Sequence, residues 1–151
     1  MISKLKKSRG FTIVELLIVI VVIGILAALV IVTYNGIQQK ARDTERKTDI
    51  KALQGHLEAY WADNAKYPTL AQVNDTTAGG FRELNFKGLD AAAYSDPADA
   101  ASGQLCGAAT AKCYGYSVTP AGCDNSATDC TNYTLTADLE SGGTFSVQSN
   151  N

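Results

Sequence analysis

The pattern of apolar and polar residues divides the chain into three parts, and the first is an almost unbroken apolar run over residues 11–32. At about 1.5 Å per residue, a helix of that length is roughly 33 Å long, which is enough to cross the hydrocarbon core of a membrane. The run therefore predicts a transmembrane helix.

The second part keeps a helical pattern but becomes amphipathic. Residues 38–47 are mostly good helix formers with interleaved acidic and basic side chains. An apolar stripe at helical spacing follows, made of Ile50, Leu53, Leu57, Tyr60 and Trp61. The pattern ends before Pro68, so we predict one continuous helix from about Thr12 to Asn64.

The third part carries the strand signals. Residues 112–119, 131–140 and 144–148 alternate apolar and polar side chains, and 141–143 have the glycines of a turn. The side chains expected to face inward are Tyr114, Tyr116, Val118, Tyr133, Leu135, Ala137, Leu139, Phe145 and Val147. We predict an α+β domain in which a three-stranded antiparallel sheet packs on the helix stripe.

The segment between helix and sheet has few apolar residues. Phe81, Leu84, Phe86 and Leu89 are expected to anchor it to the core, and residues 91–107, rich in Ala, Ser and Asp, are expected to form a surface loop.

Four cysteines lie close together near the C-terminus: Cys106, Cys113, Cys123 and Cys130. They lack the closely spaced pairs that structural zinc sites favour, so we expect two disulfides and no metal. Three pairings are possible; we favour the two local ones, Cys106–Cys113 and Cys123–Cys130.

The charge distribution separates the N-terminus from the rest. The chain has 13 basic and 15 acidic residues, a net charge of −2. Four basic residues precede Gly10, namely Lys4, Lys6, Lys7 and Arg9, which leaves 9 basic against 15 acidic residues, or −6, for the remainder. A cluster of Lys and Arg before an apolar span places the N-terminus on the cytoplasmic side. The acidic remainder argues against a domain built to bind nucleic acid.

One residue does not fit the apolar run. Glu15 lies among large apolar side chains, where a carboxylate costs about 2.5–3.5 kcal/mol or more at the membrane centre. We therefore expect Glu15 to have a charged partner.

The stretch KSRGFTIVELLIVIVVIGILAAL resembles the N-terminus of type IV pilins and of the related pseudopilins of type II secretion and competence systems. The matching features are a short basic leader ending in Gly10, then Phe11, then Glu15 and an unbroken apolar helix. The resemblance implies a pilin fold, cleavage by a prepilin peptidase between Gly10 and Phe11, and N-methylation of Phe11.

The resemblance also implies a division of the chain. Residues 1–10 form the cleaved leader, 11–34 the transmembrane and assembly helix, 35–66 its amphipathic continuation, and 67–151 the connecting loop and sheet. The precursor would lie in the cytoplasmic membrane and the mature form in an extracellular filament. The implied partners are membrane lipid, the assembly machinery and other subunits.

Cleavage would give Glu15 its partner. The new α-ammonium of Phe11 lies one helical turn from Glu15, so the carboxylate could neutralise the amine of its own chain or that of a neighbour. In the family the pairing between subunits is the accepted one. Many relatives have a proline where this chain has Val32, so Gly24 and residues 33–36 are the only weak helix formers available here.

Other kinds of site find little support. His56 lacks the partners of a catalytic base, so we expect no catalytic site and no cofactor. Four aspartates, Asp96, Asp99, Asp124 and Asp129, are expected to form turns rather than bind calcium. A basic run, Lys40, Arg42, Arg46, Lys47 and Lys51, alternates with acids and indicates a solvated or inter-subunit helix face rather than a DNA site.

These observations favour a structural subunit of a type IV pilus. The alternatives are a minor pilin or a pseudopilin of a type II secretion or competence system and, in a different class, a membrane-anchored binding domain that never polymerises.

Overall fold

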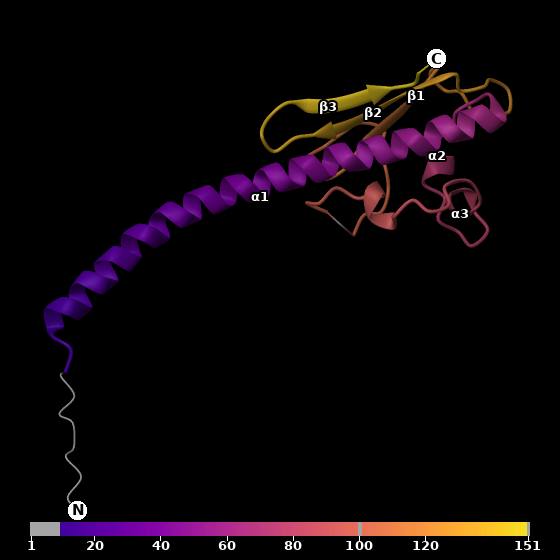
Figure 1. Ribbon diagram of the computed structural model, residues 1–151. Coiled ribbons are helices and arrows are strands. Elements are labelled where there is room, and N and C mark those ends of the chain that lie inside the picture. The colour runs from indigo at the N-terminus through magenta and orange to yellow at the C-terminus, as the bar shows by residue number, and fades with distance from the viewer. Residues whose placement is uncertain (1–9, 100, 151) are drawn as a thin grey trace, which may run out of the picture. The chain divides into compact units, whose positions relative to one another are not determined.

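The chain folds as an α+β protein with one long helix and one small sheet (Figure 1). The computed structural model describes residues 10–99 and 101–150. Helix α1 spans Ile13–Asn64 without interruption, as the residue pattern predicts. The sheet consists of β1 (Gly115–Thr119), β2 (Asn132–Asp138) and β3 (Thr144–Gln148).

Two compact units share α1, one formed by residues 1–38 and the other by 39–151. In the first unit the large apolar side chains are exposed, from 85% at Phe11 to 48% at Val19. The helix is long and apolar enough to cross a membrane by its length and composition. Because such a surface is unfavourable in water, it requires lipid or other subunits around it.

The second unit is held together by a core between α1 and the sheet. From the helix, Ile50, Leu53 and Leu57 are buried. From the sheet, the buried side chains are Tyr114 next to β1, Tyr116 in β1, and Tyr133, Leu135 and Ala137 in β2. The inward-facing stripe of the helix and the alternation of the strands are thus confirmed, except that Leu139 lies beyond β2 and outside the core cluster.

The three strands form an antiparallel sheet in the order β1-β2-β3, with Tyr116 opposite Leu135 and Leu135 opposite Val147. The first two strands are shorter than the sequence predicts. The strand β1 begins only at Gly115 because the preceding residues form a turn in which Thr110 and Cys113 pair. The strand β2 ends at Asp138 because the turn to β3, with Gly142 at φ 97° and Gly143 at φ 79°, follows directly.

The connecting segment contains α2 (Leu70–Val73), α3 (Phe81–Asn85) and the 3-10 helix η1 (Ala91–Tyr94). Phe86 is buried, and its ring lies 5.4 Å from that of Phe81 and 5.7 Å from that of His56. The expectation that Leu84 anchors this segment is wrong, since its side chain is 60% exposed. The other three predicted anchors are confirmed, since Phe86 belongs to the core and Phe81 and Leu89 pack against it.

The expectation of a surface loop over residues 91–107 is also wrong in part. Tyr94 is buried beneath the guanidinium of Arg82, which lies 3.5 Å from the centre of the ring. Arg82 also donates a hydrogen bond to the carbonyl of Gly103. Leu105 is buried, and both of its backbone groups pair with the Asn74 side chain. These contacts draw the segment onto the core.

Two disulfides close short loops on either side of β1. They join Cys106 to Cys113 and Cys123 to Cys130, the two local pairs favoured from the sequence. The first loop lies so close to the sheet that a side chain at Gly115 would collide with the backbone of Ala109. Glycine at this position therefore permits the loop to pack against the strand.

Candidate assembly site

The first turn of α1 is closed by Thr12 and Glu15. The Glu15 carboxylate oxygen Oε2 accepts hydrogen bonds from the Thr12 backbone N–H at 3.0 Å and from the Thr12 hydroxyl at 2.8 Å. In return, the Glu15 backbone N–H donates to the Thr12 hydroxyl at 3.2 Å. This reciprocal arrangement is a capping box, and it gives Glu15 a role within its own chain that the sequence analysis missed. The Thr-x-x-Glu spacing was the signal that could have revealed it.

The capping box occupies only one oxygen of the Glu15 carboxylate. Among the described residues, Oε1 takes part in no hydrogen bond or ion pair. A carboxylate has room for several donors, so Glu15 can cap its own helix and accept a cation at the same time. The geometry therefore leaves room for the ammonium that cleavage before Phe11 would create.

The predicted cleavage residues lie at the end of the helix. Gly10 and Phe11 are both exposed and precede the first helical residue, Ile13. The leader residues Lys4, Lys6, Lys7 and Arg9 lie outside the described part of the chain. Among the described residues, none covers the bond between Gly10 and Phe11. A peptidase would need this bond to be accessible.

The weak helix formers in the apolar half do not interrupt α1. Thr33 donates its hydroxyl to the backbone carbonyls of Leu29 and Val30, at 3.2 and 3.0 Å. This bonding satisfies the polar side chain inside the helix, as is common for threonine in apolar surroundings. The stretch 33–36 is therefore helical in this state of the subunit.

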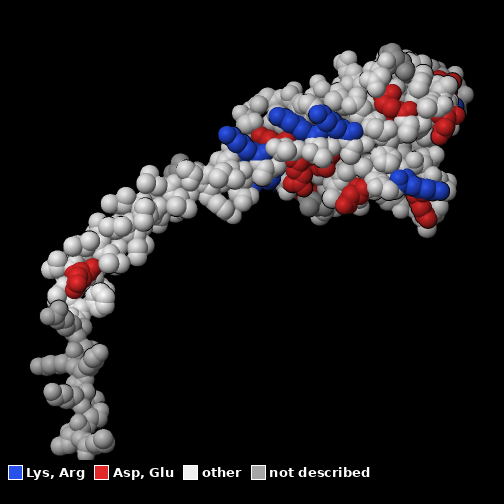
Figure 2. Space-filling model, in the orientation of Figure 1, with Lys and Arg blue, Asp and Glu red and all other residues white. Residues whose placement is uncertain are grey.

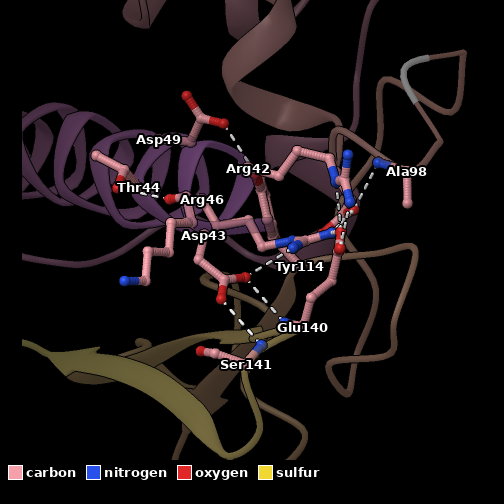
Figure 3. A network of polar contacts seen from close by, with 11 residues as sticks. Arg42, Asp43, Thr44, Arg46, Asp49, Ala98, Tyr114, Glu140 and Ser141 are labelled. Atoms are coloured by element: carbon pink, nitrogen blue, oxygen red, sulfur yellow. Dashed lines mark hydrogen bonds and ion pairs between the residues drawn. The ribbon is translucent and has the colours of Figure 1, made fainter. Parts of the chain in front are cut away.

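A buried ion-pair network joins α1 to two other parts of the second unit (Figure 3). Arg46 is 1% exposed; its guanidinium contacts Asp96 at 2.7 Å, Asp43 at 2.9 Å and Glu140 at 3.0 Å. Asp96 follows η1 and Glu140 follows β2. One arginine thus ties the helix, the connecting segment and the turn between β2 and β3 together.

Asp43 extends the network to the backbone of that turn. Its carboxylate accepts hydrogen bonds from the N–H groups of Glu140 and Ser141, at 2.8 and 3.0 Å. Burial would raise the pKa of Asp43, but the bonds from Ser141, Glu140 and Arg46 outweigh it and lower the pKa to about 2. The hydrogen bond from Arg42 lowers the pKa of Glu140 to about 2. Both carboxylates therefore stay charged at neutral pH.

The network corrects two expectations. Arg42 and Arg46, placed by the sequence in a basic run on an exposed or inter-subunit face, are bound within the subunit to Glu140 and to the buried carboxylates. Arg46 lies one turn before Ile50 and therefore continues the apolar stripe. This position could have indicated that Arg46 faces the core. Asp96 accepts from the N–H of Ala98, as a turn residue does, but it is fully buried and paired with Arg46. No local pattern in the sequence indicates that pairing.

The remaining candidate residues have structural surroundings. Asp124 accepts hydrogen bonds from the N–H groups of Ser126 and Ala127, which confirms it as a turn residue. Asp129 pairs with Lys66 at 3.2 Å, and His56 packs on Phe86. Within the described residues, no group of three His, Cys, Asp or Glu side chains is arranged to hold a metal ion.

Comparison with known proteins agrees with the N-terminal motif. Residues 5–31 match the family model described as the prokaryotic N-terminal methylation motif. The chain is similar to type II secretion system core protein G of Dickeya chrysanthemi, with 42% identity over 67 residues, or 44% of each chain. It is 46% identical over 66 residues to the protein of that name in Escherichia coli (strain K12), which is 44% of this chain and 46% of that protein.

The match is confined to part of each protein. The chain spans about half the length of the curated relatives it matches. No solved structure matches it. The relatives favour the pseudopilin alternative over the type IV pilus subunit that the sequence analysis placed first.

Proposed function

We propose that this chain, whose N-terminal segment matches the methylation motif and is similar to type II secretion system core protein G, is a pseudopilin. Such a protein is a structural subunit that polymerises through α1 into the filament of a type II secretion system. The observation that carries the proposal is the combination, in one segment, of the methylation motif, an exposed apolar helix half and a glutamate in its first turn. The capping box uses one carboxylate oxygen of that glutamate, and polymerisation would give its charge a cation to bind.

Maturation supplies the charge that assembly needs. A prepilin peptidase cuts between Gly10 and Phe11 and methylates the new N-terminus of Phe11. The resulting ammonium and the Glu15 carboxylate are each unfavourable alone in an apolar environment, whereas a matched pair is tolerated. Since Oε2 of Glu15 is engaged with Thr12, Oε1 is the oxygen that accepts the ammonium.

The apolar half of α1 determines where the subunit resides. Before assembly, the precursor is stored in the cytoplasmic membrane with its N-terminus in the cytoplasm. After assembly, the apolar helices pack against one another, and the second unit forms the surface of a periplasmic filament. The partners are further subunits, the prepilin peptidase and the membrane components of the secretion machinery.

The mass of the mature N-terminus tests this proposal. Full-length chain is purified from cells that contain a prepilin peptidase, and its N-terminal peptide is analysed by mass spectrometry. We expect a methylated Phe11 as the first residue. A chain that still begins at Met1 would contradict maturation and, with it, polymerisation, and would favour the non-polymerising anchor.

A genetic test separates the pseudopilin from the pilus subunit. The gene is deleted in a host that has both a type II secretion system and pili, and the chain is then restored. We expect the deletion to stop release of secreted enzymes while pili remain. Loss of pili with normal secretion would assign the chain to the pilus instead.

A further inference from the structure

The part of α1 in the second unit carries two rows of charge on opposite sides of its buried stripe. One row consists of Lys40, Lys47 and Lys51, all exposed. The other row consists of Glu45 and Asp49, extended by Asp90 from the residue before η1. At 100° per residue, the lysine row and the two helix acids lie about 160° apart around the helix axis. The buried residues, such as Arg46 and Ile50, lie between them.

The lysine row has no partner within the subunit. Among the described residues, no ion pair engages Lys40, Lys47 or Lys51. Figure 2 shows basic side chains in a row along this part of α1, with acidic side chains gathered beside them on the side of the connecting segment. The row covers Lys40 to Lys51, about 16 Å along the helix.

The acidic row also lacks compensation. Among the described residues, no ion pair engages Glu45, Asp49 or Asp90. Arg42, three residues before Glu45, is held by Glu140 through two hydrogen bonds. Burial raises the pKa of Asp49 to about 6, and the nearby charges of Glu45, Asp90 and Asp96 add to the increase. A cation brought against this row would relieve the repulsion.

We propose that the lysine row of one copy docks against the acidic row of the next copy. This contact rests on the proposed polymerisation. It is the lateral contact between the second units of neighbouring copies. The face of α1 between the rows carries small, exposed side chains at Ala41, Thr44 and Thr48, so nothing bulky holds a neighbour away.

The position of the two rows determines what kind of assembly they produce. Each copy uses a different surface to bind the copy before it and the copy after it, which is a heterologous interface. Such contacts do not close into a dimer but continue from copy to copy, as a filament requires. Contacts between exposed charges add modest affinity but strongly select the orientation and partner.

Charge reversal with rescue tests the contact in the full-length chain. One variant, K47E/K51E, reverses the lysine row, and the other, E45K/D90K, reverses the acidic row while leaving Asp49 bonded to Tyr114. We expect each variant alone to reduce the yield of filaments recovered from the periplasm about tenfold, and their co-expression to restore it to within about twofold of the wild type. Membrane-inserted chain with both disulfides formed is the criterion for folding.

Two controls separate the possible outcomes. K112E reverses an exposed lysine outside both rows and is expected to assemble normally. E45K alone changes a side chain that makes no hydrogen bond to the described residues, and it should show the same loss in smaller measure. Normal filament yield from K47E/K51E, or no recovery on co-expression, would overturn the docking contact. Absence of filaments from the wild-type chain would instead overturn the proposed function.

Discussion

Two carboxylates on α1, Asp43 and Asp49, respond to their surroundings in opposite ways. Hydrogen bonds lower the pKa of Asp43 to about 2, so its contribution to stability is present above an ordinary pKa of 3.8 and is lost as the pH falls towards 2. Burial raises the pKa of Asp49 to about 6, so the stability provided by its protonated form is present below 3.8 and is lost as the pH rises through 6.

The substitution Asp49→Asn is therefore expected to stabilise the subunit at neutral pH. In the wild type, the Tyr114 hydroxyl donates a hydrogen bond to the Asp49 carboxylate at 2.8 Å. Asparagine keeps an oxygen that accepts this hydrogen bond, and it cannot ionise. We expect a gain of about 1 kcal/mol in the free energy of unfolding at pH 7 and almost no gain at pH 4. The gain at pH 7 is small because water screens the charge of the half-buried carboxylate. Urea unfolding in detergent at both values measures this, and an equal effect at the two pH values would refute it.

Arg46 is the residue whose loss we expect to cost most. Arg46→Met leaves Asp96, which is 0% exposed, without its bidentate partner. An unpaired buried charge costs about 3–5 kcal/mol in the free energy of unfolding. The matched control is Arg42→Met, which removes a partly exposed arginine bound to Glu140 and should cost much less. Equal losses in urea unfolding would show that Asp96 tolerates the loss of its partner.

At the scale of elements, the second unit combines a long helix with short segments that have little core of their own. The strands β1 and β3 have five residues each, and α2 has four. Elements of this size depend on tertiary contacts and cross-links for their stability. The contacts of Arg82 stabilise the connecting segment, and the two disulfides cross-link the chain around β1.

The two disulfides allow a matched comparison. Each joins residues seven apart, so the entropy of loop closure predicts the same loss, about 2 kcal/mol, when either pair is changed to serine. Cys130 is fully buried, whereas Cys106 is half-buried. Removal of Cys123–Cys130 should therefore lower the thermal midpoint further than removal of Cys106–Cys113. The opposite order would mean that the loop packed on Gly115 matters more than burial of the sulfur.

At the scale of the whole molecule, the two units have separate tasks. The first presents an apolar surface and Glu15, and the second has its own core, ion network and disulfides. A change in Glu15 should therefore affect assembly without affecting the fold of residues 39–151.

The substitution Glu15→Ala tests this separation. We expect filament yield to fall to background because the ammonium of Phe11 loses its carboxylate, while the thermal unfolding of the second unit stays unchanged. Glu15→Gln serves as a control because it can retain a bond to Thr12 but carries no charge, and it should fail in the same way. Normal filaments from either variant would show that the pairing is dispensable.

Local patterns in the amino-acid sequence were enough to predict the helix, the strands and the side of each that faces the core. The apolar run, the stripe from Ile50 to Trp61 and the alternation around Tyr133 and Leu135 each repeat at the period of one regular structure, so local pattern was enough to predict α1 and the sheet. Glu15 was conspicuous because a single charge in an apolar run is costly, and its spacing from Thr12 also indicates the capping box that the structure contains.

Contacts between residues far apart in the sequence became visible only in the folded chain. The pairing of Arg46 with Asp96 joins positions 50 residues apart, and the burial of Tyr94 beneath Arg82 depends on how the connecting segment folds back. The periodicity of apolar residues in the sequence does not indicate such contacts, because each depends on three-dimensional packing rather than on spacing along the chain. For the same reason, Leu84 could not be distinguished from Phe86 until their surroundings were known.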